Sequence, residues 1–287
     1  DTLRGVGLDT AASTSRKELT INETYAEGNA TNLSNYYGHV SAFNSDGFEL
    51  DHVTGQPPLL TNMSGRTYVG WSWNAGDTDG KTYTVKVVSD SGNKYRFDDF
   101  GTSAVTLDLA EGGTYIFDQS DASNATHPLR FYTAADKTGG EYTTGVTTAG
   151  TPGQAGAYTQ IVVAASAPTL YYQCSAHANM GGQANTNSTL GSSNFDGSRQ
   201  SVTKANTTAG FSIGTFTAQS SGSATVGHGL GVAPDVIITK SRTLSSNWYT
   251  YHQSIGENGW IKLESTGAAT TGTVSYTHLT LPTSTHG

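Results

Sequence analysis

Short segments that alternate apolar and polar residues are the feature that most constrains the fold of this chain. Seven of them lie between residues 80 and 175, namely Tyr83–Val88, Lys94–Phe97, Val105–Leu109, Thr114–Phe117, Leu129–Tyr132, Thr159–Val163 and Leu170–Gln173. A period of two predicts strands, and the turns between them are rich in glycine and aspartate. No stretch keeps a helical period for more than a turn or two. The chain is therefore predicted to be all-β, with an antiparallel β-sandwich at about residues 80 to 186.

Composition excludes several classes of function. The 287 residues carry a formal net charge of -8, which argues against a nucleic-acid partner because such a partner needs a basic face. No apolar run reaches membrane-spanning length, so no membrane insertion is expected. One cysteine excludes an internal disulfide framework. The chain starts at Asp1 inside sequence that is typical of structure, and we expect it to be a fragment.

The single cysteine belongs to a set of soft metal ligands. Cys174 is followed by His177 and then Met180 at intervals of three, and His127 precedes them on another predicted strand. A thiolate, two imidazoles and a thioether suit copper, which accepts thioether sulfur where calcium or magnesium does not. Strand parity places Cys174 and His127 each on the apolar face of its own segment. The pattern predicts a mononuclear copper site with Met180 as the weak ligand.

This segment resembles the cupredoxin family, whose shortest ligand loops read Cys-x-x-His-x-x-Met after an aromatic strand. The resemblance covers roughly residues 80 to 186. It implies a cupredoxin-like sandwich with one type 1 copper ion held by His127, Cys174, His177 and Met180. One departure is that the residues after Met180 are polar, whereas cupredoxins close with an apolar strand. We expect the closing strand to be short and residues 183–208 to form a polar linker.

The flanking segments resemble a lectin-like jelly-roll repeat of marine bacteriophage tail-fibre and other virion proteins. The resemblance rests on Ser41–Phe48, on Thr67–Gly76 within a predicted strand Arg66–Gly76, and on Gly227–Ile238. The last of these is a glycine-rich loop that leads into a predicted buried strand. The flanks would then be the end of one repeat and the start of the next.

The resulting domain organisation has four parts. Residues 1–76 are the C-terminal part of a lectin-like β-sandwich repeat, 77–190 the cupredoxin-like domain, and 191–273 the N-terminal part of a second repeat. Residues 274–287 are predicted to be a tail derived from a sequencing adaptor, because Val274–Thr283 is the translation of GTC TCT TAT ACA CAT CTG ACG CTG CCG ACG. This tail is left out of functional reasoning.

Catalysis is not expected. No Ser-His-Asp, Gly-x-Ser-x-Gly or His-Glu-x-x-His arrangement is present, and the adjacent Asp98 and Asp99 would face apart on a strand. A Cys-His nucleophile is the remaining option, and Met180 favours a metal site over it. We therefore interpret the protein as a metal-binding or structural one.

The function predicted for the whole chain is that of a structural fragment of a phage virion, in a tail fibre or adhesion component. Its location would be the virion or the extracellular space. Its partners would be other virion proteins, a glycan or receptor on the host surface, and further copies in a homo-oligomer; no carbohydrate-binding residue can be assigned. Two alternatives stay open: a secreted or periplasmic blue-copper electron carrier, and a metal-free spacer with the cupredoxin fold.

Overall fold

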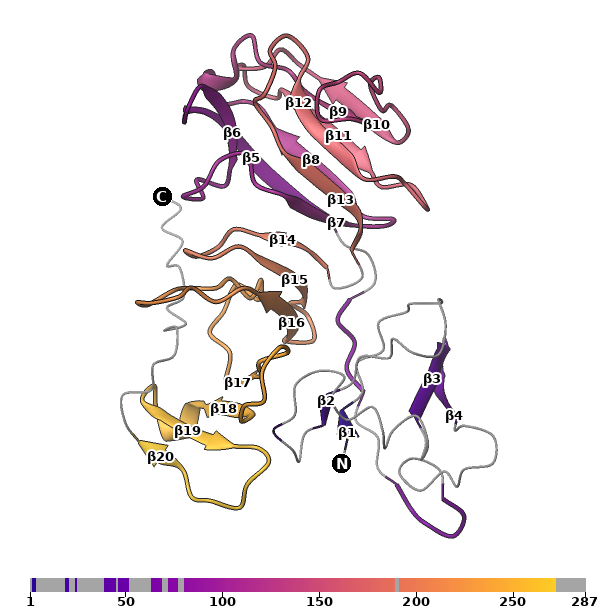
Figure 1. Ribbon diagram of the computed structural model, residues 1–287, viewed down its shortest axis with the longest axis vertical. Coiled ribbons are helices and arrows are strands. Elements are labelled where there is room, and N and C mark those ends of the chain that lie inside the picture. Colours follow the sequence, from indigo (N-terminus) through magenta and orange to yellow (C-terminus); the bar gives the residue numbers. More distant parts are fainter. Residues whose placement is uncertain are drawn as a thin grey trace. The chain divides into compact units, whose positions relative to one another are not determined.

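The computed structural model describes residues 2–3, 19–20, 24, 39–44, 46–51, 63–68, 72–76, 80–188 and 191–271 (Figure 1). Almost every regular element in these ranges is a strand. The helical elements among them are two 3-10 turns, η1 (Ala122–Asn124) and η2 (Gln253–Ile255). The all-β prediction is therefore confirmed. No helix in the described ranges is long and apolar enough to cross a membrane.

The chain divides into two compact units. One consists of Asp1–Ser72 with Pro234–Val274, and the other of Trp73–Ala233 with Ser275–Gly287. The second unit holds the predicted metal ligands.

Two sheets form the sandwich of the second unit (Figure 1). The five-stranded sheet has the order β10-β11-β8-β5-β6, with β5 at Gly80–Ser89, β6 at Asn93–Phe97, β8 at Thr114–Asp118, β10 at Val146–Ala149 and β11 at Tyr158–Val162. The four-stranded sheet has the order β7-β13-β12-β9, with β7 at Leu107–Ala110, β9 at Leu129–Tyr132, β12 at Leu170–Cys174 and β13 at Gln183–Ser188. All seven predicted strands are present.

Aromatic residues from both sheets fill the core between them. The fully buried side chains include Tyr83, Phe97, Phe117, Phe131 and Tyr172. Phe117 of one sheet meets Phe131 of the other with ring centroids 5.5 Å apart, and Phe97 meets Tyr172 at 5.1 Å. These residues occupy alternate positions on their strands, so the apolar period of two is what closes the sandwich.

The sandwich differs from its sequence prediction in two respects. First, β5 pairs with β8 and β13 pairs with β7 in parallel, so the sheets are mixed rather than wholly antiparallel. Second, β13 is a six-residue strand within the predicted linker 183–208. It buries Ala184 and Thr186 and turns its other polar side chains outward. A strand with one face in solvent needs to bury only its other face, and in β13 the small residues Ala184 and Thr186 are enough for this.

A three-stranded sheet follows the sandwich within the same unit. Its order is β14-β15-β16, with β14 at Ser192–Asn194, β15 at Ser201–Asn206 and β16 at Phe211–Phe216. The β14 backbone touches the sandwich core, since the Tyr83 hydroxyl donates to the Ser193 carbonyl at 2.8 Å. Phe195 joins the buried aromatic cluster. Residues just after 190 therefore pack with the sandwich.

The other unit holds shorter sheets. Its strands are β1 (Thr2–Leu3), β2 (Leu19–Thr20), β3 (His39–Asn44), β4 (Gly47–Asp51), β17 (Val236–Thr239), β18 (Tyr249–His252), β19 (Gly259–Lys262) and β20 (Thr270–Thr271). β1 pairs with β2, β3 with β4, and the last four run in the order β17-β18-β19-β20. β3 and β4 form an antiparallel hairpin in which Asn44 pairs with Gly47.

Two flanking predictions were wrong. The described parts of Arg66–Gly76, residues 66–68 and 72–76, contain no strand. Within this range Trp73 is 55% exposed and stacks on Phe211 of β16 at 5.8 Å, so it packs flat on a surface strand. The strand predicted to be buried after the glycine-rich loop is present as β17, but Val236 and Ile238 are 46% and 48% exposed. The predicted adaptor tail, residues 274–287, lies outside the described residues.

Candidate metal centre

Cys174 is the last residue of β12 and lies in the core. Its side chain is fully buried, as are those of Leu170 and Tyr172 on the same strand face. In the antiparallel pairing of β12 with β9, Cys174 lies opposite Leu129. The end of β12 therefore meets the start of β9, and this brings the segment before β9 close to the cysteine.

His127 lies in that segment, two residues before β9, and is 9% exposed. The prediction that His127 lies on a strand was wrong, because β9 begins only at Leu129. Its N–H donates to the Asn124 carbonyl at 2.8 Å, which closes the turn after η1. Its carbonyl accepts two hydrogen bonds of 2.9 Å, one from the Tyr95 hydroxyl and one from the Gln119 amide. Both donors are buried. The backbone of His127 is therefore fixed by the protein itself.

Residues 175–179 form an exposed loop that carries His177. The Ser175 N–H donates to the Pro128 carbonyl at 3.0 Å, which continues the β12–β9 pairing toward His127. The Lys94 ammonium donates to the Asn179 carbonyl. The Lys137 ammonium lies 3.2–3.4 Å from the carbonyl oxygens of Cys174, Ser175 and His177. We call residues 175–179 the ligand loop.

Three ligand atoms converge at this end of the sandwich. The Cys174 sulfur lies 3.5 Å from Nδ1 of His177 and 3.9 Å from Nδ1 of His127, and all three atoms are within 4.8 Å of one another. Bonds of about 2.0 Å to nitrogen and about 2.3 Å to sulfur place two ligands of one ion roughly 3.6 to 3.8 Å apart. The sulfur–nitrogen distances therefore fit a single ion between the three groups.

Met180, the fourth predicted ligand, is 1% exposed and belongs to the same buried cluster as Cys174. Its N–H donates to the Gln173 side-chain oxygen at 3.1 Å, and its carbonyl accepts from the Tyr95 N–H at 2.8 Å. Its backbone is therefore anchored to both sheets, to β12 and to β6. Met180 thus places a buried thioether in the core cluster that also holds Cys174, and its role as the weak ligand stays a prediction.

Two glycines after Met180 allow the ligand loop to return close to β12. A Cβ on Gly181 would lie 1.6 Å from the Tyr172 carbonyl oxygen, and one on Gly182 would lie 2.6 Å from the Ala104 carbonyl oxygen. Any side chain here would push the loop away from the sheet. The Gly-Gly pair is therefore a steric requirement of the site.

The electrostatics favour neutral imidazole and neutral phenol. Burial lowers the pKa of His127, and a charge on His177 lowers it further. Burial raises the pKa of the Tyr95 hydroxyl, and the neighbouring Cys174 raises it further. A neutral imidazole leaves one ring nitrogen free to bind a metal.

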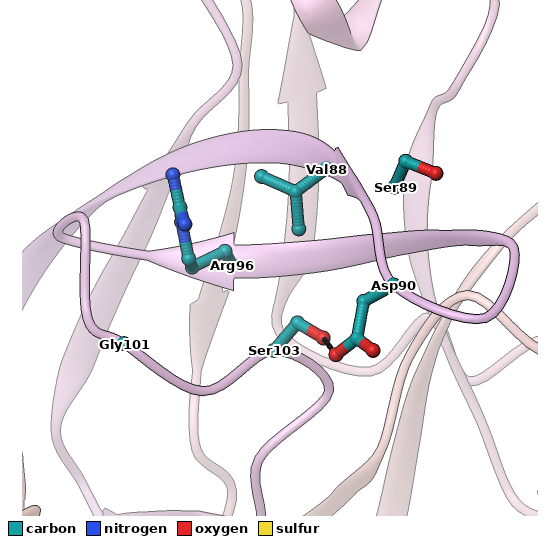
Figure 2. A pocket seen from close by; sticks show the side chains of 6 residues that line it. All are labelled: Val88, Ser89, Asp90, Arg96, Gly101 and Ser103. Carbon is teal, nitrogen blue, oxygen red and sulfur yellow. Dashed lines mark hydrogen bonds between the residues drawn. The ribbon is translucent and has the colours of Figure 1, made fainter.

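Other groups considered in the sequence do not form a site. Asp98 and Asp99 turn to different partners: Asp98 accepts from the Thr84 N–H at 2.8 Å, and Asp99 pairs with Lys86 at 2.7 Å. A surface cavity of about 340 Å³ is lined by Val88, Ser89, Asp90, Arg96, Gly101 and Ser103 (Figure 2). In it, Ser103 donates to Asp90 at 2.6 Å. None of the predicted metal ligands lines it.

Sequence reasoning identified the histidines and the cysteine that converge, but it missed the residues that position them. The positioning residues are Tyr95, Gln119, Lys137 and Gln173. The first three lie far from the ligand motif in sequence, and Gln173 is a polar residue that belongs to no motif. The two glutamines could have been noticed from the sequence. Gln173 lies within a predicted apolar strand and Gln119 comes just after one, and a glutamine is unusual at such positions. A buried amide there indicates backbone groups that need partners.

Comparison with known proteins gives one match. Residues 179–286 match the model of a family described as a domain of unknown function, DUF7483. The match covers less than half of the chain; it begins at the end of the ligand loop and runs into the segment predicted to be an adaptor tail. No curated protein and no solved structure matches the chain.

Proposed function

We propose that the sandwich of residues 80–188 binds one copper ion through His127, Cys174 and His177, with Met180 as a weak fourth ligand. The observation that carries the proposal is the convergence of one sulfur and two Nδ1 atoms from two separate segments at distances that suit one ion. A thiolate with two imidazoles and a thioether favours copper over the hard oxygen-binding cations.

The chain's own residues would prepare the site before metal arrives. Hydrogen bonds from Tyr95 and Gln119 hold His127, and the Gln173 side chain holds Met180. Cys174 would lose its proton on binding, since a thiolate is the species that ligates. Bound copper would supply one-electron redox chemistry, and the exposed His177 lies at the solvent side where an electron partner could approach.

The test is a copper(II) titration of the full chain followed by visible absorption. We expect an intense thiolate-to-copper band that saturates at one equivalent. Cys174→Ser should abolish the band, and Met180→Leu should keep it while changing the reduction potential. Met63→Leu and His252→Gln are matched controls, because neither residue belongs to the cluster. A wild-type protein without the band at stoichiometric copper would contradict the proposal.

For the whole chain we propose a structural role in a phage tail fibre or adhesion component. The resemblance of the flanking segments to lectin-like virion repeats supports this role, and the all-β architecture is compatible with it. Partners would be other virion proteins, a host-surface glycan or receptor, and further copies of the chain. Detection of its peptides in purified virions would support the role; their absence from virions whose genome encodes the chain would contradict it.

An electron carrier is the alternative that the exposed His177 favours. Rapid, reversible electron exchange between the copper form and a soluble redox protein would support it. A copper form that exchanges electrons only over hours would contradict the electron-carrier function and favour the structural role.

A further inference from the structure

The ammonium group of Lys137 contacts the backbone of the ligand loop. Its Nζ atom is 3.2 Å from the carbonyl oxygen of Cys174, 3.3 Å from that of Ser175 and 3.4 Å from that of His177. An ammonium has three N–H donors and no acceptor, so these three carbonyls can take all of its hydrogen bonds. Two of the three belong to the proposed copper ligands.

Lys137 is itself held in place by its own loop between β9 and β10. Its N–H donates to the Ala134 carbonyl at 3.0 Å, and its carbonyl accepts from the Gly140 N–H at 3.2 Å. Its backbone has a positive φ of 68°, which a residue other than glycine adopts at a cost. The ammonium also lies 6.0 Å from the centre of the Tyr132 ring. The tight turn therefore aims the side chain at the ligand loop.

The positive charge of Lys137 lies close to the proposed copper site. Within the part of the chain that the structure describes, no ion pair joins Lys137 to a carboxylate. Its positive charge therefore acts on the polar groups around it, and these are the backbone of Cys174 and its loop. A cation near a metal–thiolate centre favours the state with less positive charge.

We propose that Lys137 is a positioning residue of the copper site, which tethers the ligand loop and raises the preference of the site for copper(I) over copper(II). This inference rests on the proposed copper function. The two effects have different origins, because the tether depends on three convergent hydrogen bonds and the copper(I) preference depends on charge. Substitutions that separate geometry from charge can therefore test it.

Three variants of the full chain separate these effects. Lys137→Met removes both the donors and the charge. Lys137→Arg keeps the charge, but its planar fork does not reproduce three convergent donors. Lys94→Met is the matched control on the same loop, because Lys94 donates to the Asn179 carbonyl, which belongs to no proposed ligand.

The first measurement needs no metal. Amide hydrogen exchange in the metal-free protein should become at least tenfold faster in Lys137→Met at Ser175 and Met180, whose N–H groups donate to the Pro128 carbonyl and the Gln173 side chain, and also faster in Lys137→Arg. Amides of strand β8, which lies between β5 and β11 in the five-stranded sheet, should keep their wild-type rates in both, which excludes global unfolding. Wild-type exchange rates at Ser175 and Met180 in Lys137→Met would overturn the tether.

The second measurement is the reduction potential of the copper form. We expect Lys137→Met to lower the copper(I) preference about tenfold, which is about 59 mV for a one-electron couple. Lys137→Arg should recover most of this loss, and Lys94→Met should shift the potential less than Lys137→Met. A Lys137→Met protein that binds copper with an unchanged potential would overturn the inference, because the lysine would then be structural only. A wild-type protein without a copper signal contradicts the proposed function instead, and the exchange rates then decide the tether alone.

Discussion

At the scale of single residues, the site depends on close packing of backbone against backbone. Gly181 crosses directly over the Tyr172 carbonyl, two residues before Cys174 on β12. Both segments are fixed at that point, since the Tyr172 N–H donates to the Gly182 carbonyl at 3.0 Å and the Gly181 N–H donates to Gln173 at 3.1 Å. Neither β12 nor the chain at Gly181 can therefore move without breaking one of these hydrogen bonds.

Gly181→Ala is therefore expected to be strongly destabilising. The new methyl group would overlap the Tyr172 carbonyl oxygen at 1.6 Å, and relief requires moving the chain that carries Met180. Overpacking usually costs about 1–3 kcal/mol, and we expect about 3 kcal/mol or more here because the clash is with backbone. Urea denaturation measures it. Gly101→Ala is the control, because a Cβ there meets no atom within 4 Å, and its effect should stay within about 0.5 kcal/mol. Equal stability of the two variants would contradict this reading.

At the scale of elements, β13 shows how a polar sequence becomes a central strand. It lies between β7 and β12 in the four-stranded sheet, and its buried positions are Ala184 and Thr186. The Thr186 hydroxyl lies 2.7 Å from the Ala167 carbonyl oxygen and 2.8 Å from the Pro168 carbonyl oxygen. Backbone pairing and one buried hydroxyl thus replace the apolar side chains that the sequence pattern would need.

Thr186→Val should lower the free energy of unfolding by about 1–2 kcal/mol. Valine has the same shape, but it cannot donate to the two carbonyls, and the loss of a buried hydrogen bond leaves an acceptor without its partner. Thermal or urea denaturation measures the change. Asn187→Ala on the exposed face of the same strand is the control and should be nearly neutral. If Thr186→Val were as stable as the wild type, the hydroxyl would not be what holds β13.

The same elements show what sequence can and cannot predict here. Strands with aromatic residues at alternate positions, such as Tyr115 and Phe117 of β8, were predictable because their burial depends on their own side chains. β10 and β13 were not, because their residues are small or polar and only the neighbouring strands make them strands. The place of Cys174 on the buried face of β12 followed from parity, whereas His127 lies in a turn before β9, and the tether by Lys137 likewise depends on a turn that no periodicity encodes.

At the scale of the whole molecule, the division into two compact units determines where metal binding can act. All four proposed ligands belong to the unit of Trp73–Ala233, whereas β17 to β20 belong to the other unit. A ligand that binds only the native state stabilises what it binds by RT ln(1 + [L]/Kd). Copper should therefore stabilise the unit with the sandwich and leave the other unit unchanged.

Calorimetry of the full chain is expected to show two unfolding transitions, and copper should raise the midpoint of only one. At a free copper concentration about one hundred times the Kd, the gain is about 2.7 kcal/mol. Trp248 and Trp260 lie in the unit without the site, so fluorescence of a Trp71→Phe, Trp73→Phe variant follows that unit alone and should report an unchanged midpoint. Cys174→Ser should remove the copper shift from the calorimetric transition. A copper-dependent midpoint in the fluorescence of this variant would contradict the expectation, because the two units would then unfold as one.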